Sequence, residues 1–175
     1  FVEQKGLDVL FDALAKIDSN LDWHMTLVGD GPERSSLMSR ATQHHIKNRI
    51  TFKPWAAKSA LPSIYRNADI FLLPSHDEGM ANALLEAMAA GLPVIGTRVS
   101  GTTEVMQDGE TGILVRPKNS DDLAAAIAAL SKDDKRREAY GRAARARVES
   151  SYSWTTAAEK WIDVLESALH TKSAT

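Results

Sequence analysis

Short, largely apolar runs alternate along the chain with longer segments in which apolar residues recur every three or four positions. The apolar runs lie at residues 23–28, 49–53, 70–74, 92–96 and 113–115. Short apolar runs bounded by turn residues are typical of strands that are buried on both faces of a parallel sheet. The pattern therefore predicts at least five strands of the parallel type.

Helical patterns separate these runs. Apolar residues at positions 7, 10, 11, 14 and 17 show the spacing of an amphipathic helix over residues 7–17. Further helices are expected at 33–45, 59–67, 81–90, 121–130 and 135–149, and Phe1 and Val2 are interpreted as the end of another strand. This alternation predicts a doubly wound, Rossmann-like α/β/α sandwich of three layers around a parallel sheet.

The end of the chain has a different character. Ser153 is expected to cap a helix over residues 154–170, whose apolar positions 154, 158, 161, 162, 165 and 169 form one stripe. We therefore divide the chain into a domain over residues 1–152 and a terminal helix over 153–175. The residues after Lys172 are expected to fray.

Composition excludes several classes of protein. The 175 residues are 43% hydrophobic and 25% charged, as in an ordinary soluble domain. The formal net charge of −2 argues against a nucleic-acid partner, since such proteins usually carry a basic excess. Without Cys there can be no disulfide and no thiolate metal site, and no apolar run approaches the roughly 20 residues of a spanning helix. We expect a cytoplasmic setting. Because Phe1 is not a natural initiator residue, we also expect the sequence to be part of a longer chain.

The stretch from Ser75 to Thr97 carries the candidate chemistry. A strand is predicted to run into a polar loop with Glu78, and a helix follows it. A helix that starts beyond the end of a parallel strand offers free amides and a positive dipole end to a phosphate. Glu78 and Glu86 lie eight positions apart. The two oxygens of a carboxylate are well suited to accept hydrogen bonds from a vicinal diol, such as that of a ribose or hexose. Together these features predict a nucleotide-sugar site.

At these residues the chain resembles the donor half of the retaining GT-B glycosyltransferases of glycosyltransferase family 4. The spacing Glu-x7-Glu, with the second Glu opening the string EAMAxGxPVI, carries the resemblance. Five further strings agree in order, namely EQKG at 3–6, LVGDGP at 27–32, YRNADIFLLPS at 65–75, GTTEV at 101–105 and DGETGILV at 108–115. The resemblance covers nearly the whole chain.

The resemblance assigns roles to individual residues. It implies that Glu78 is the catalytic carboxylate beside the sugar and its leaving phosphate, and that Glu86 accepts from the nucleotide ribose. A bridge or cap for a neighbouring loop is the alternative for Glu86, which we expect to be buried beside Leu85 and Met88. The expected diphosphate contacts are Lys5, Gly79, Met80, Ala81 and Asn82, although Lys5 could also be a solvated loop lysine.

Other expected contacts have structural alternatives. Trp55 could stack on the nucleobase or cap the core. Gly101 and Thr102 could approach the sugar ring, or Thr102 could cap a tight turn. In two-domain relatives the terminal helix crosses to the other domain, so Trp161 is either an interdomain contact or part of the core.

No Asp-x-Asp pair occurs, so neither a metal nor another cofactor is expected. Lys5 and the helix N-terminus would instead neutralise the leaving diphosphate.

The resemblance implies a transferase of the hexosyl type. It would move a sugar from a nucleoside diphosphate sugar to a hydroxyl of a glycan, a lipid or a small molecule. The acceptor would be held mainly by a second domain, so this chain alone should be inactive, and the whole enzyme could associate peripherally with the inner face of a membrane. A nucleotide-sugar epimerase-like protein and a non-catalytic nucleotide-binding module are the alternatives.

Overall fold

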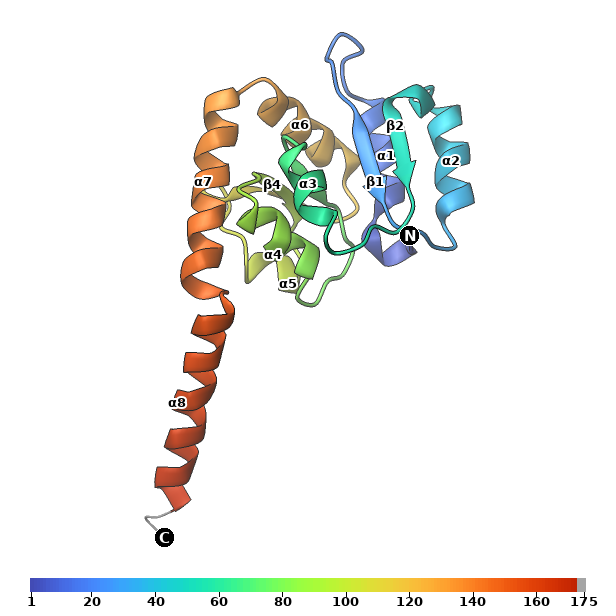
Figure 1. Cartoon of the computed structure of the whole chain (residues 1–175). Coiled ribbons are helices and arrows are strands. Elements are labelled where there is room, and N and C mark those ends of the chain that lie inside the picture. Colours follow the sequence, from blue (N-terminus) through green and yellow to red (C-terminus); the bar gives the residue numbers. More distant parts are fainter. Residues whose placement is uncertain (173–175) are drawn as a thin grey trace.

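Strands and helices alternate in the predicted order in the computed structural model, which describes residues 1–172 and the side chains of residues 1–167 (Figure 1). The strands are β1 (Met25–Val28), β2 (Ile50–Lys53), β3 (Phe71–Leu73), β4 (Val94–Thr97) and β5 (Gly112–Val115). The α-helices are α1 (Leu7–Ala15), α2 (Arg34–Gln43), α3 (Leu61–Arg66), α4 (Asn82–Ala89), α5 (Ser100–Thr103), α6 (Ser120–Ser131), α7 (Asp134–Ser151) and α8 (Trp154–Lys172). Two 3-10 turns are η1 (Glu3–Lys5) and η2 (Lys47–Arg49).

All strand pairs are parallel, as predicted, but they form two sheets. β1 pairs with β2, so that Met25 lies opposite Ile50. The second sheet has the order β3-β4-β5, and Val94 of β4 lies between Phe71 and Gly112. The expectation of one continuous sheet is wrong in this respect, because β1 and β3 do not pair with each other in the described part of the chain.

Residues 1–6 connect the two sheets at the carboxyl ends of their strands. The nitrogen of Phe1 donates to the carbonyl of Asp30, which lies just beyond β1. The amide of His76, just beyond β3, donates to the carbonyl of Gln4 at 2.8 Å. Phe1 and Val2 pair with no strand, so their prediction as a strand end is wrong for this structure. Their position nevertheless brings η1 to the edge where β3 ends.

Helices flank the parallel strands in three α/β/α layers, as the sequence pattern predicted (Figure 1). α1 packs against α2 and α6, while α4 packs against α7. Two apolar cores result. One centres on Phe11 of α1, and the other on Leu84 and Met88 of α4. Burial of these apolar side chains holds α1 and α4 in place, and so fixes the loops that precede them.

Helix α8 extends away from the other elements as a long arm (Figure 1). The Ser153 hydroxyl accepts from the amide of Thr156 at 3.0 Å, which confirms the predicted N-cap. Trp161 is 67% exposed, so its interpretation as a core residue is wrong. A crossing of this helix to another domain stays a prediction. The side chain at stripe position 169 and the tail after Lys172 lie outside the described residues.

Candidate functional site

An ion pair joins the first turn of the chain to the loop after β3. The Lys5 ammonium lies 2.8 Å from Oε2 and 3.1 Å from Oε1 of Glu78. The Ser75 hydroxyl donates to the same Oε2 at 2.8 Å. Glu78 is 9% exposed, whereas 44% of the Lys5 side chain remains exposed. A buried carboxylate needs such partners, and here the cation that satisfies it also faces solvent.

The backbone of the loop over residues 75–79 is held by three other parts of the chain. The carbonyl of Ser75 accepts a hydrogen bond from a side chain of β4, and the carbonyl of Glu78 accepts one from the first turn of α5. Between them, His76 and Asp77 each form a hydrogen bond with Gln4. The hydrogen bonds are Thr97 Oγ1 to Ser75 O (2.5 Å), His76 N to Gln4 O (2.8 Å), Gln4 Nε2 to Asp77 O (3.1 Å) and Gly101 N to Glu78 O (3.0 Å). These bonds fix the loop, and with it the position of the Glu78 carboxylate.

Helix α4 begins beside this loop with an uncapped amino terminus. Its N-cap residue, Ala81, is extended and provides no side-chain acceptor. The described residues include no acceptor for the amides of Met80, Ala81, Asn82 and Ala83. Free amides at a helix start, together with the helix dipole, favour an anion. The edge therefore combines one cation and a set of free amides with a buried carboxylate.

Glu86 lies on a different surface from the one we expected. It is exposed, so the expectation of a buried carboxylate is wrong. The helical period turns Leu84 and Met88 towards the core and leaves Glu86 on the accessible side of α4. Its Oε2 accepts a hydrogen bond from the Tyr65 hydroxyl at 3.0 Å. A carboxylate that is accessible to solvent and oriented by one donor is well suited to accept hydrogen bonds from the hydroxyls of a ligand.

The remaining predicted contacts divide into accessible and engaged groups. Trp55 is 85% exposed, so its interpretation as a core cap is wrong, and Met80 is 59% exposed. Thr102 is fully buried inside α5, whose N-cap is Val99, so Thr102 caps no turn. The Gly101 amide is already bonded to Glu78 O. Sugar contacts by Gly101 and Thr102 stay predictions. In this structure the Gly101 amide is already engaged and the Thr102 side chain is buried.

Sequence reasoning missed two residues of the site. Ser75 and Tyr65 stand within a quoted motif, but neither received a role. Ser75 lies only three positions before Glu78, close enough for a hydroxyl to reach its carboxylate across a turn. Tyr65 lies 21 positions before Glu86 and meets it only through the fold.

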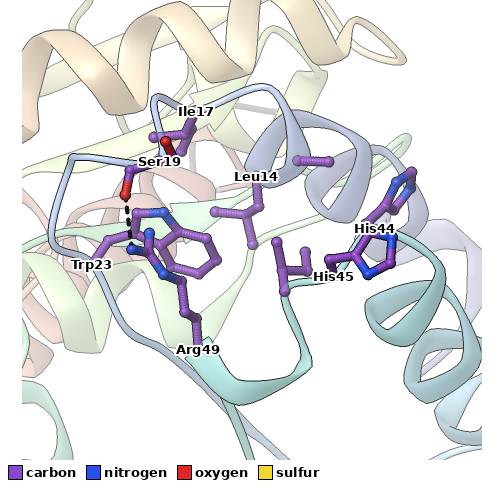
Figure 2. A pocket seen from close by; sticks show the side chains of 9 residues that line it. Leu14, Ile17, Ser19, Trp23, His44, His45 and Arg49 are labelled. Atoms are coloured by element: carbon purple, nitrogen blue, oxygen red, sulfur yellow. Dashed lines mark hydrogen bonds between the residues drawn. The ribbon is translucent and has the colours of Figure 1, made fainter.

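A hollow of about 260 Å³ lies elsewhere, at the amino ends of β1 and β2 (Figure 2). Trp23 and Arg49 line it together with His44. The Arg49 guanidinium donates to Ser19 O at 3.1 Å and to Leu21 O at 3.0 Å, and it lies over the Trp23 ring. These contacts show Arg49 holding the loop before β1. None of the predicted donor-binding residues lines this hollow, so it is not the candidate nucleotide-sugar site.

Within residues 1–172 there is no helix long and apolar enough to cross a membrane. Among residues 1–167, whose side chains the structure describes, there is no group of three or more His, Cys, Asp or Glu side chains placed to hold a metal ion.

Comparison with known proteins places the chain in a family. The family described as Glycosyl transferases group 1 matches residues 1–147. The chain is 34% identical over 172 residues to the GDP-mannose-dependent alpha-(1-6)-phosphatidylinositol monomannoside mannosyltransferase of Mycobacterium tuberculosis. That alignment covers 94% of this chain and 45% of the mannosyltransferase.

Two solved structures share the fold. Sucrose-phosphate synthase from Thermosynechococcus elongatus superposes with a TM-score of 0.88 and 27% identity, over 97% of this chain and 44% of that one. Anabaena Alr3699/HepE, solved in complex with UDP, gives a TM-score of 0.87 and 26% identity, over 95% and 46%. The chain thus spans about half the length of these relatives. It belongs to the Glycosyl transferases group 1 family.

Proposed function

We propose that this chain is the donor-binding, C-terminal half of a retaining GT-B glycosyltransferase, which moves a hexose from a nucleoside diphosphate sugar to an acceptor hydroxyl. One observation carries the proposal. Lys5, the buried Glu78 and the free amides that open α4 meet at one edge of the sheet. Family membership supports it, as do a relative that is GDP-mannose-dependent and a structural neighbour in complex with UDP.

The diphosphate would lie against the amino terminus of α4. The amides of Met80, Ala81 and Asn82 would donate to its oxygens, and Lys5 would add a full positive charge. These groups are in place before the ligand arrives, so little reorganisation is needed as negative charge grows on the leaving group. Binding and departure of the diphosphate would then need no metal ion.

Glu78 would act on the sugar side of the diphosphate. Its carboxylate is held by Lys5 and Ser75, so it keeps a fixed orientation close to the amides. There it would accept a hydrogen bond from a sugar hydroxyl and stabilise the positive charge that develops at the anomeric carbon. The bond from that carbon to the phosphate oxygen breaks, and the diphosphate keeps the electron pair. The acceptor oxygen bonds to the same face, and its proton passes to the departing phosphate.

The acceptor would be held mainly by another domain of the whole enzyme. Trp161, Ile162 and Leu165 of α8 are more than half exposed, which supports this helix as the element that docks there. A cytoplasmic location, with peripheral association at the inner face of a membrane, stays a prediction for the whole enzyme.

Calorimetric titration of the chain with UDP-glucose, GDP-mannose and ADP-glucose tests the proposal, with uridine, guanosine and adenosine as matched ligands that lack phosphate. At least one nucleotide sugar should bind, and its nucleoside should bind at least tenfold more weakly because the diphosphate contacts are lost. Absence of saturable binding for all three sugars up to millimolar concentration would contradict a donor site on this chain.

A further inference from the structure

Tyr65 lies at the end of α3 and contacts Glu86, the residue that the family resemblance assigns to the nucleotide ribose. Its ring packs edge-on against Phe71 of β3, with 6.0 Å between ring centroids. Its hydroxyl donates to Glu86 Oε2 at 3.0 Å. Burial of the ring, and then the neighbouring Glu86 carboxylate, raise the pKa of Tyr65. The phenol is therefore protonated, and so a donor, throughout the physiological pH range.

The hydrogen bond restrains a side chain that would otherwise be free. Glu86 is exposed, and Tyr65 is the partner that its carboxylate has among the described residues. A long, exposed glutamate loses rotamer freedom when a ligand orders it, and this loss weakens binding. Because Tyr65 is fixed by Phe71, it orders one oxygen of Glu86 in advance and leaves the other oxygen open.

We infer that Tyr65 is a positioning residue, which sets the Glu86 carboxylate for the two hydroxyls of the donor ribose. The inference rests on the proposed function, because it takes the ribose to be the ligand of Glu86. Tyr65 touches no ligand in this account and acts through Glu86 alone. Its effect should therefore appear only with ligands that carry ribose hydroxyls, and only while Glu86 is present.

The test uses Tyr65→Phe, which keeps the ring on Phe71 and removes only the hydroxyl. UDP and GDP are titrated against the 175-residue chain, each beside its 2′,3′-dideoxy analogue. Tyr152→Phe is the matched control, since it removes a tyrosine hydroxyl that donates to Glu104 O at 2.7 Å. Thermal unfolding is measured for every variant.

We expect Tyr65→Phe to weaken the ribonucleotide that binds by roughly threefold to tenfold, the range for ordering one such side chain. The dideoxy analogue should bind to it as it does to the unchanged protein. In a Glu86→Gln background the same change should have no further effect, and Tyr152→Phe should change neither ligand.

Three results would overturn the inference. Equal weakening of ribo- and dideoxy ligands would mean that Tyr65 only supports the fold. A ribose preference that Glu86→Gln abolishes and Tyr65→Phe leaves intact would reject Tyr65 but keep the ribose contact. If the unchanged protein binds a diphosphate without preferring its ribose form, the role of Glu86 fails and Tyr65 fails with it, although a phosphate site remains.

Discussion

Lys5 and Glu78 lie 73 positions apart in the sequence, and their charged groups are in contact, with Nζ 2.8 Å from the nearer carboxylate oxygen. The family resemblance predicts separate roles for the two residues, phosphate binding for the lysine and a sugar contact for the glutamate. The structure shows that each also neutralises the other. A diphosphate bound at this edge would share Lys5 with Glu78, so donor affinity should depend on this pair.

Gly79 and Gly101 form a contrasting pair for mutation. A Cβ at Gly79 would meet nothing within 4 Å, and its φ does not require glycine, whereas a Cβ at Gly101 would lie 1.4 Å from Gly79 O. Gly79→Ala should leave the free energy of unfolding within about 0.5 kcal/mol of the original. It should nevertheless weaken nucleoside diphosphate binding roughly tenfold, because the added methyl group would occupy space that the phosphate approaches.

Gly101→Ala should instead destabilise the fold by about 1–3 kcal/mol, because two backbone segments must separate. Chemical denaturation and calorimetric titration of both variants check the pair. Tight diphosphate binding by Gly79→Ala would show that the ligand does not approach the backbone at Gly79.

Asp12 should make stability depend on acid pH. Arg40 donates to both of its oxygens at 3.0 and 2.7 Å, and His44 lies 2.9 Å from one of them. The Arg40 hydrogen bonds hold the pKa of Asp12 below its ordinary value of 3.8. A lowered folded-state pKa contributes stability that is present above the unfolded pKa and is lost as the pH falls through the folded value. Because the pair is about one-third exposed, we expect a contribution of only about 1 kcal/mol near pH 7.

Denaturant unfolding of Asp12→Asn at pH 7 and at about pH 2.5 measures this contribution. The variant should be less stable than the original at pH 7, and the difference should shrink at the lower pH. Asp69→Asn, at an exposed position before β3, serves as the control and should cost little at either pH. A loss of equal size at both pH values would show that the Asp12 charge is not the cause.

Chelation tests the expectation that donor binding needs no metal. The titration with the nucleotide sugar that binds is repeated after dialysis against EDTA, and again with added Mg²⁺ or Mn²⁺. Affinity should change less than twofold, because Lys5 and the α4 amides supply the positive charge. Loss of binding after EDTA treatment, with recovery on adding a metal, would contradict this expectation.

The isolated chain should bind donor without transferring sugar. Orientation of an acceptor hydroxyl against the anomeric carbon can account for about 7–11 kcal/mol of the barrier, and we assign that surface to another domain. The whole enzyme should transfer with retention, and Glu78→Ala in it should abolish most turnover. Product analysis by mass spectrometry checks both forms, and transfer by the 175 residues alone would show that they hold the acceptor.

The order of strands and helices could be predicted from the sequence because each pattern is local. The meeting of Lys5 with the Glu78 loop does not come from a strand end, since Phe1 and Val2 pair with no strand, and the His76 amide instead holds the two segments together by donating to Gln4 O. The break between β1 and β3 could not be predicted, because an apolar run does not specify which strand lies beside it. Residues 1–6 connect the two sheets through individual hydrogen bonds, which no periodic pattern of residues in the sequence indicates.

The details of the site depended on contacts between distant residues. Glu86 looked buried because Leu85 and Met88 are its neighbours in sequence, yet the helical rotation places it on the accessible side. Tyr65 reaches it from another helix. The ion pair of Lys5 with Glu78 depends on the rotamers of two long side chains, which the spacing of residues along the sequence does not specify.

The central claim is that a nucleoside diphosphate binds where Lys5 meets the start of α4, and calorimetric titration of Lys5→Ala tests it most directly. Lys16→Ala is the matched control, because Lys16 is also 44% exposed and pairs with an aspartate, Asp121, at 2.6 Å. We predict that the original chain binds UDP or GDP with a Kd of roughly 10 μM to 1 mM. Lys5→Ala should weaken that binding about tenfold or more, and Lys16→Ala should not change it. Equal binding by the original chain and by Lys5→Ala would contradict the account.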